Sequence, residues 1–180
     1  MITINFEETY EPIEVAEDFS YMTFNTVDKQ GAAILIKVKI TPLESPLLPN
    51  VSNLAFGPLN SDDTINDAAK IPHENPSKAF STILLFCLTY LNQFPERTIG
   101  LDGSNEVRAY LYHRMFLTNK EYLEEYFVSI GVDWYVKLLR NNDVERDPAT
   151  GNPYFKPKPE PFDYTRIRDL YRYYMFHLRQ

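Results

Sequence analysis

Residues 75–95, NPSKAFSTILLFCLTYLNQFP, carry the strongest secondary-structure signal in the chain and decide its fold class. Asn75 can cap a helix with its side chain, and Pro76 suits the first helical position. Apolar residues then recur at helical spacing until Pro95 ends the helix. Because apolar side chains occupy most sides of this helix, other parts of the fold must cover it. We therefore expect a long central helix over residues 76–94.

The residues before this helix are typical of β-strands. Residues 2–6 alternate apolar and polar side chains, and residues 51–56 form a short apolar run. Two longer runs, 21–27 and 32–40, are separated by Asp28-Lys29-Gln30-Gly31, a spacing typical of a hairpin whose turn uses the glycine. Residues 57–75 show no periodicity, which indicates a polar connection.

The residues after the helix mix both signals. Residues 97–101 indicate a short strand, Asp102-Gly103-Ser104 a turn, and residues 104–116 and 120–126 two helical stretches. Residues 132–140 fit a strand or a helix. Residues 141–163 contain 5 of the 13 prolines, with a hairpin tip expected over 147–152. The pattern predicts one α+β domain over residues 1–180: a mainly antiparallel sheet packed against the long helix, with a proline-rich insertion at about 141–163.

Composition narrows the class of protein. Hydrophobic residues make up 44% of the 180 residues, too many for a disordered chain. A formal net charge of −7 does not favour nucleic acid as a partner. The single cysteine, Cys87, excludes a disulfide framework within one chain and falls among core positions of the helix. No stretch reads as a signal peptide or a membrane span, so we expect a cytoplasmic protein without membrane contact.

Several motifs resemble those of an uncharacterised bacterial domain family seen mainly in Bacteroidetes. Residues 53–57, NLAFG, are similar to the family's NLGFG element, and residues 103–115, GSNEVRAYLYHRM, are similar to its GSTPARTRLYRM signature. Residues 127–131, FVSIG, resemble its FEVYG element, and residues 173–180 resemble its closing YEAFLVRR, which is a final strand there. The resemblance covers roughly residues 50–180.

The resemblance implies a fold and no activity. It favours a strand for the C-terminal segment. The residue pattern alone favours a helix there, because Ile167, Leu170, Tyr171 and Tyr174 recur at helical spacing. This chain departs from the family at Tyr110, which replaces the second arginine of the signature, and in its longer insertion after residue 131.

One candidate binding site is a turn at a helix N-terminus. A strand that enters a Gly-Ser turn presents backbone N–H groups and the positive end of the helix dipole to an anion. Arg108 lies one turn after Ser104 and could close over that anion. The residues of this hypothesis are Gly103, Ser104, Asn105, Arg108 and His113. The alternative is structural: Ser104 caps the helix and Arg108 pairs with Asp102 or Glu106.

Other chemistry has weaker support in the sequence. The nucleotidyltransferase fold also has a Gly-Ser pair after a strand, but no paired carboxylates on a strand follow here. The three histidines are scattered and no nucleophile is spaced for a triad, so the sequence assigns no catalytic residue, metal or cofactor. The tail interleaves arginine with tyrosine, which suits single-stranded nucleic acid, a partner interface or a sheet edge. The candidate interaction surface is Arg168, Tyr171, Arg172 and Tyr174.

Two functions follow from these observations. The first is a non-enzymatic binding or interaction protein that meets another protein, or a second copy of itself, through the tail or the proline-rich loop. The alternative is an enzyme or sensor for a phosphorylated small molecule or nucleotide bound at Gly103–Arg108. Under either function, Val107, Leu111 and Met115 are expected to face the long helix as one apolar stripe.

Overall fold

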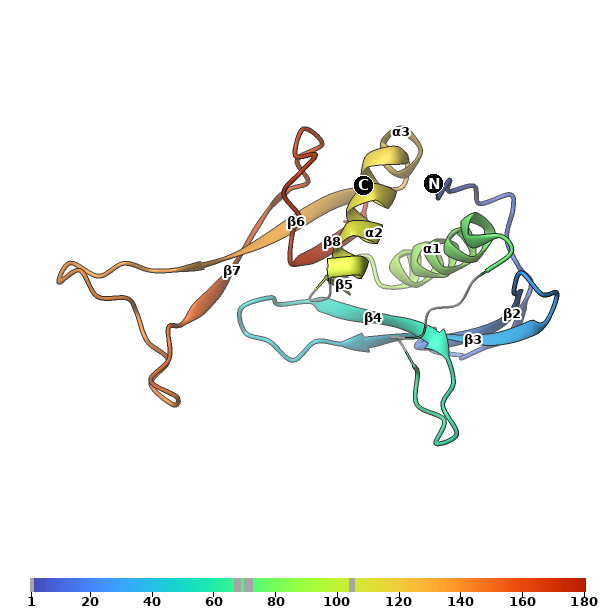
Figure 1. The fold of residues 1–180 in the computed structure, drawn as a ribbon, viewed down its shortest axis with the longest axis horizontal. Coiled ribbons are helices and arrows are strands. Elements are labelled where there is room, and N and C mark those ends of the chain that lie inside the picture. The colour runs from blue at the N-terminus through green and yellow to red at the C-terminus, as the bar shows by residue number, and fades with distance from the viewer. Residues whose placement is uncertain (1, 67–68, 70–72, 104–105) are drawn as a thin grey trace.

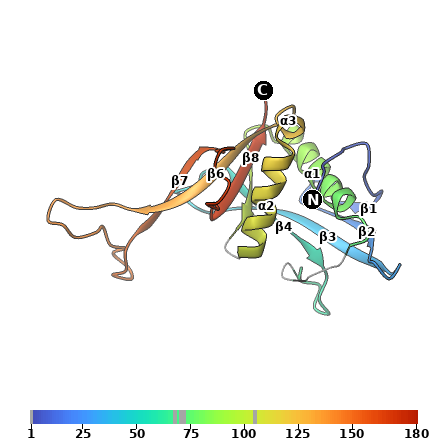
Figure 2. The ribbon, with the colours of Figure 1, turned by 45° about the horizontal axis from the view of Figure 1, so that its top comes forward.

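A computed structural model describes residues 2–66, 69, 73–103 and 106–180. Within them, eight strands form one sheet in the order β1-β2-β3-β4-β5-β8-β6-β7. Helices α1, α2 and α3 lie over the same face of this sheet (Figures 1 and 2). The elements are β1 Pro12–Val15, β2 Tyr21–Val27, β3 Ala33–Pro42, β4 Val51–Pro58, α1 Pro76–Gln93, β5 Thr98–Asp102, α2 Glu106–Thr118, α3 Lys120–Leu123, β6 Phe127–Val136, β7 Phe155–Pro161 and β8 Tyr173–Leu178.

The structure confirms a mixed α and β fold with a mainly antiparallel sheet. Among the described strands, β4 and β5 pair in parallel and the other neighbours are antiparallel. Parallel neighbours need a crossover connection. Helix α1 lies in that connection, with Asn75 Oδ1 accepting from Lys78 N–H at 2.9 Å as its N-cap. That α1 is the central helix, and that the chain is one domain, stay predictions.

The hairpin of β2 and β3 forms as expected. Gly31 takes a left-handed φ of +83°, and Asp28 Oδ1 accepts from the N–H groups of Gln30 and Ala32 at 2.9 and 2.8 Å. Strand β3 then alternates, with Ile36, Val38 and Ile40 buried toward the helices. Local sequence therefore determines both the turn and the face of this hairpin.

The N-terminal residues 2–6 are not a strand, contrary to their alternating pattern. They run over the helices, where side chains take the place of a neighbouring strand and accept from the backbone N–H groups. The donors and acceptors are Thr3 to Ser77 Oγ (3.0 Å), Ile4 to Asn119 Oδ1 (2.8 Å), Asn5 to Ser81 Oγ (2.9 Å), Phe6 to Tyr122 OH (2.8 Å) and Tyr10 to Thr82 Oγ1 (2.8 Å). The backbone N–H groups of residues 3–6 thus have acceptors without a neighbouring strand.

The expected apolar stripe of α2 is wrong at its first position. Val107 is 64% exposed, Leu111 is half-buried and Met115 is buried. The buried face consists of Ala109, Tyr112, His113, Met115 and Phe116. This helix packs on β5 and β8, and the large rings of Tyr112 and Phe116 contact Tyr174 there. Burying those rings removes more apolar area from water than burying the smaller Val107 would.

The C-terminal third adds three strands. Residues 127–136 form β6, so the ambiguous 132–140 segment is a strand at its start, and the final segment is the strand β8. The proline-rich insertion contains β7 in its second half. Its hairpin tip is confirmed, because Asp147 N–H donates to Asn152 O at 2.9 Å and Gly151 has a φ of +71°.

No helix among the described residues is both long enough and apolar enough to cross a membrane.

Candidate functional site

A two-stranded arm projects from one edge of the sheet. Strand β6 pairs with β8 as far as Val132 and beyond it pairs with β7 alone. We define the arm as residues 134–159, which comprise the outer parts of β6 and β7 and the loops between them. Figures 1 and 2 show it extending away from the helices and the rest of the sheet. Its side chains therefore have little of the protein to pack against.

The arm exposes large apolar side chains. Leu138 is 67% exposed and Phe155 57%, although such residues are usually buried. Trp134 and Phe155 lie on the same face of the arm, because Trp134 pairs with Pro157 and Val136 with Phe155. Exposed apolar side chains of this kind make the arm a candidate interaction surface. The full set of exposed large apolar residues in the arm is Trp134, Tyr135, Leu138, Leu139 and Phe155.

The outer edge of β7 is poor in hydrogen-bond donors. Phe162 N–H donates to Ser129 O of β6 at 3.0 Å, and successive N–H groups alternate sides along a strand. The odd-numbered residues of β7 therefore direct their backbone nitrogens outward, and three of these four residues are proline: Pro157, Pro159 and Pro161. Proline has no N–H to offer. A partner strand would therefore find few backbone donors on this edge, and side chains must supply most of the recognition.

A hollow of about 370 Å³ lies at the base of the arm, lined by Asp102, Trp134, Arg172 and Tyr173. Tyr173 OH donates to Asn53 Oδ1 at 3.2 Å, and its ring covers Gly100, where a Cβ would meet the phenol oxygen at 1.9 Å. Burial raises the pKa of Tyr173 to about 12, so the phenol stays protonated. The hollow thus combines aromatic surface with one cationic and one anionic side chain.

The arm also carries positive charge on a negative protein. Its 26 residues contain five Lys or Arg and three Asp or Glu, a net charge of +2, while the whole chain carries −7. Arg146 pairs with Asp143 at 3.1 Å and Lys156 with Glu145 at 2.7 Å. Lys137 and Arg140 are exposed and form no ion pair within the part of the chain that the structure describes. These two cations are available to an acidic partner.

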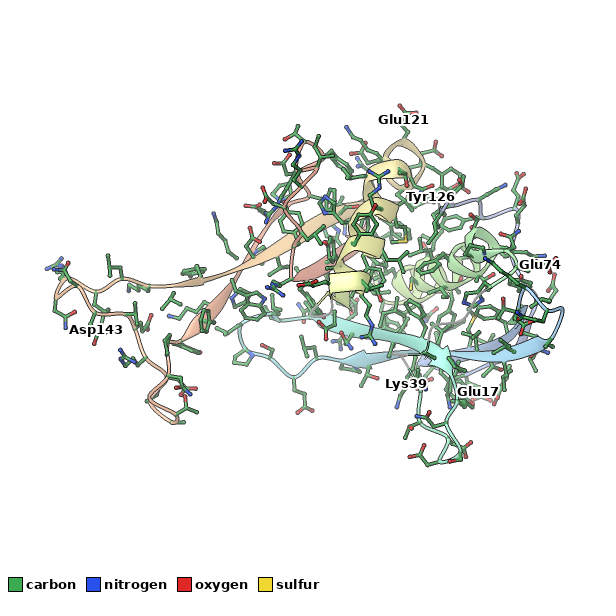
Figure 3. All side chains as sticks on the ribbon, viewed as in Figure 1. Glu17, Lys39, Glu74, Glu121, Tyr126 and Asp143 are labelled. Carbon is green, nitrogen blue, oxygen red and sulfur yellow. The ribbon has the colours of Figure 1, made fainter. Side chains whose placement is uncertain are left out.

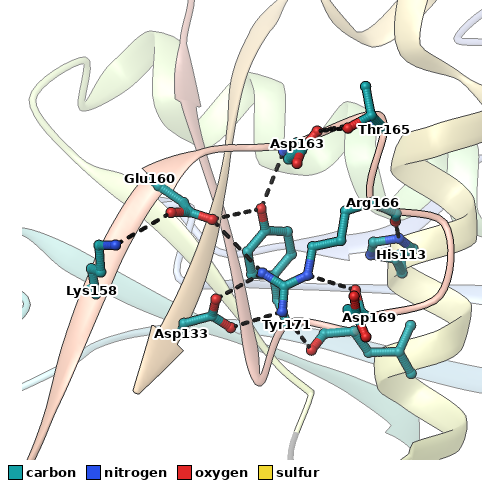
Figure 4. A network of polar contacts seen from close by, with 10 residues as sticks. His113, Asp133, Lys158, Glu160, Asp163, Thr165, Arg166, Asp169 and Tyr171 are labelled. Atoms are coloured by element: carbon teal, nitrogen blue, oxygen red, sulfur yellow. Dashed lines mark hydrogen bonds and ion pairs between the residues drawn. The ribbon is translucent and has the colours of Figure 1, made fainter. Parts of the chain in front are cut away.

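A polar network fixes the root of the arm (Figure 4). Arg166 donates to both carboxylate oxygens of Asp133, from Nη1 at 2.7 Å and from Nη2 at 3.1 Å. Its Nε donates to Asp169 O at 2.8 Å, and its guanidinium lies 4.1 Å from the ring centre of Tyr171. Tyr171 OH in turn donates to Glu160 at 3.1 Å. A two-point Arg–carboxylate pair holds the two side chains in one orientation.

This network is structural. Every guanidinium nitrogen of Arg166 already has an acceptor in the protein, and the pair with Asp133 raises the pKa of Arg166 further above its usual range. An anionic ligand would have to displace Asp133 to reach it. Because Asp133 precedes the arm, the network orients the arm relative to the loop before β8.

The structure describes three of the five residues of the predicted anion site, Gly103, Arg108 and His113. Gly103 is buried, and its N–H donates to Arg172 O at 3.0 Å, so that donor is occupied. The ring of Tyr174 fills the adjoining space, 3.0 Å from where a Cβ of Gly103 would lie. Arg108 is half-buried. Ser104 and Asn105 lie outside the described residues.

His113 packs against the loop before β8. It is 1% exposed and packed among the rings of Phe162, Tyr171 and Tyr174. Its Nε2 donates to the Arg166 carbonyl, which can only accept, so the neutral ring leaves Nδ1 bare. Nδ1 is buried without a partner among the described residues. Burial lowers the pKa of His113, which keeps the ring neutral.

The predicted tail surface divides in two. Arg168 and Arg172 are exposed, and Arg172 lines the hollow. Tyr171 and Tyr174 are fully buried, which is a correction to their placement on an interaction surface. The hydroxyl groups of both tyrosines form hydrogen bonds within the protein: Tyr171 OH donates to Glu160, and Tyr174 OH donates to Ala109 O at 2.9 Å. Their rings fill the core between α2 and the sheet.

Two further observations bear on chemistry. No group of three or more His, Cys, Asp or Glu among the described residues is placed to hold a metal ion. Cys87 is buried as expected, and burial raises the pKa of its thiol, which disfavours the reactive thiolate. Sequence reasoning missed Trp134 and Phe155 as surface residues. The signal was present in residues 155–161, FKPKPEP, because alternating prolines indicate an edge strand.

Comparison with known proteins gives one match. The model of a family of unknown function, DUF6934, matches residues 6–144, which is more than three quarters of the chain. The match begins well before residue 50, where the motif resemblance starts, and ends within the arm. No curated protein and no solved structure matches.

Proposed function

This chain belongs to DUF6934, a family of unknown function, and we propose that it is a non-enzymatic binding protein that engages a protein partner through the arm. The observation that carries the proposal is the set of large apolar side chains exposed on a projecting hairpin. Aromatic residues and arginine are enriched in protein interfaces. Trp134 and Arg172 meet at the hollow, where a partner side chain could be enclosed.

The electrostatics of the arm indicate the kind of partner. Lys137 and Arg140 flank Leu138 and Leu139, so apolar contact area is bordered by positive charge. A partner surface that combines apolar side chains with carboxylates fits this pattern. The proposed cytoplasmic location follows the sequence argument given above, and the binding of nucleic acid is not favoured at a net charge of −7.

The alternative function, an enzyme or sensor for a phosphorylated small molecule, has less support. It depends on the backbone N–H groups of the Gly103-Ser104 turn and on Arg108, with His113 nearby in the sequence. The N–H of Gly103 is bonded to Arg172 O, and His113 packs against the Arg166 loop. The arm is therefore the better candidate site.

Site-specific photo-crosslinking in the native cell tests the proposal. A photoreactive residue at Leu138 should give a discrete protein adduct, because that side chain is 67% exposed on the arm. The matched control is Val107, 64% exposed on α2, where no adduct is expected. A second variant, Trp134→Ser with Phe155→Ser, should fold normally and reduce the Leu138 adduct. An equal yield at both positions would contradict the proposal.

A further inference from the structure

We infer that the partner of the arm is a second copy of this chain, bound through its acidic N-terminal end. This inference rests on the proposed function, because it names the partner of the same surface. It adds a second surface, which we call the acidic end and define as residues 7–18.

The acidic end has the opposite charge to the arm. Residues 7–18 contain six Asp or Glu, and the first Lys or Arg of the chain is Lys29. Glu11 and Glu17 are exposed, as are all four residues of β1. The structure adds two cations, Lys78 over the ring of Tyr10 at 4.6 Å and Lys37 over the ring of Tyr21 at 4.7 Å. Six carboxylates outnumber them, so this end of the sheet keeps a negative potential.

The acidic end also exposes apolar side chains. Ile13 is 59% and Val15 41% exposed on β1. They alternate with Glu14 and so point to the opposite face of this edge strand, whose exposed edge offers a partner both aliphatic area and a carboxylate. This is the chemistry that the arm calls for, in which apolar residues are bordered by Lys137 and Arg140. The two surfaces are complementary in both charge and polarity.

The two surfaces lie too far apart to meet within one copy. Strands β1 and β7 are the opposite edges of the eight-stranded sheet, and seven strand spacings of about 4.8 Å amount to roughly 34 Å. Figure 3 places Asp143 of the arm and Glu17 of the acidic end on opposite sides of the molecule. The contact is therefore between copies and joins unlike surfaces. A repeated contact of this kind closes into a ring or extends as a chain.

Sedimentation of the full chain with charge-reversed variants tests the inference. The arm variant is Lys137→Glu with Arg140→Glu, which takes the arm from a net charge of +2 to −2. The end variant replaces the exposed Glu7, Glu8, Glu11 and Glu17 with lysine, which takes the acidic end from −6 to +2. The wild type should sediment above its monomer mass of 21.1 kDa in a concentration-dependent way, and less so at high salt. Each variant alone should be monomeric. An equimolar mixture of the two should assemble again, because each reversed surface meets a reversed partner.

A matched control separates local contact from net charge. A control that replaces Glu44, Glu74, Glu121 and Glu125 with lysine makes the same charge change as the end variant at exposed positions outside both surfaces, and it should assemble like the wild type. A monomeric wild type, a mixture that stays monomeric, or a control that dissociates equally would overturn the inference. A monomeric wild type together with a Leu138 adduct to a different protein would leave the proposed function standing. The absence of any protein adduct at Leu138 would contradict both this inference and the proposed function.

Discussion

The side chain of Asn119 pairs with the backbone of Ile4 as a neighbouring strand would. Ile4 N–H donates to Asn119 Oδ1 at 2.8 Å, and the Nδ2 of the same amide donates to Ile2 O at 3.0 Å. A third bond, from Nδ2 to Met115 O at 2.8 Å, ties the amide to α2. The buried Asn119 thus joins the N-terminal segment to the helices, and Ile4 enters the core beside it.

Replacing Asn119 with alanine should lower the free energy of unfolding by about 1–3 kcal/mol, because buried donors and acceptors lose their partners. Urea denaturation measures the loss. Asn92→Ala is the matched control: its exposed amide donates to Leu88 O, and the change should stay within about 0.5 kcal/mol. Equal effects of the two substitutions would show that Asn119 does not anchor the N-terminal segment.

Two positions of α2 test which face of the helix is buried. Phe116→Ala should cost about 3–5 kcal/mol of stability, because the ring is 1% exposed and leaves a cavity. Val107→Ala should change stability by about 0.5 kcal/mol or less, since Val107 is largely exposed. Thermal and urea unfolding of the two variants compare them directly. A larger loss at Val107 would restore the stripe expected from the sequence.

The ring of Tyr171 occupies the space beside Gly131, where it lies 2.3 Å from the position that a Cβ would take. Because Tyr171 is fully buried, it cannot move aside cheaply, and Gly131→Ala should cost about 1–3 kcal/mol from overpacking. The same substitution should cost much less in a Tyr171→Leu background. A double-mutant cycle by urea denaturation measures this coupling, and strict additivity of the two changes would refute the steric explanation.

His113 should make stability depend on pH in the weakly acidic range. Burial lowers its pKa below the usual 6.5, so the unfolded state binds more protons as pH falls through 6.5 toward the lowered value. Stability is therefore present above pH 6.5 and lost as pH falls, by at most about 1.4 kcal/mol per pH unit for one histidine.

The test is the slope of unfolding free energy between about pH 7 and pH 5. His113→Phe should be less stable at pH 7, because Arg166 O loses its donor, and should have a shallower slope than the wild type. His73, whose pKa burial also lowers, should account for part of the remaining slope. An unchanged slope in His113→Phe would mean that His113 binds protons equally in the folded and unfolded states, which would contradict a pKa lowered by burial.

The sequence predicted an element correctly where the residues that stabilise it lie within the element or next to it. The hairpin turn needed only Asp28 and Gly31, and the start of α1 needed only the amide of Asn75. Residues 2–6 show where alternation fails. Their pattern suits a strand, but the acceptors that hold them come from α1, Asn119 and α3, which are distant in sequence.

The candidate site was less predictable for the same reason. The Gly103 turn has the sequence of an anion site, yet Arg172 O takes its N–H and Tyr174 fills its space, both from the far end of the chain. Tyr171 and Tyr174 read as surface residues until the sheet order placed them under α2. The arm is defined by the absence of a third strand beyond Val132, which no local pattern encodes.

The alternating prolines of β7 disfavour aggregation of this protein through the edge of its sheet. An edge strand with free N–H groups is a template on which further strands can stack into cross-β fibres. Pro157, Pro159 and Pro161 remove those groups from the exposed edge while leaving the arm's side chains accessible. The protein can thus expose the apolar side chains of the arm in a crowded cell, because contacts through side chains remain reversible and do not extend the sheet by strand addition.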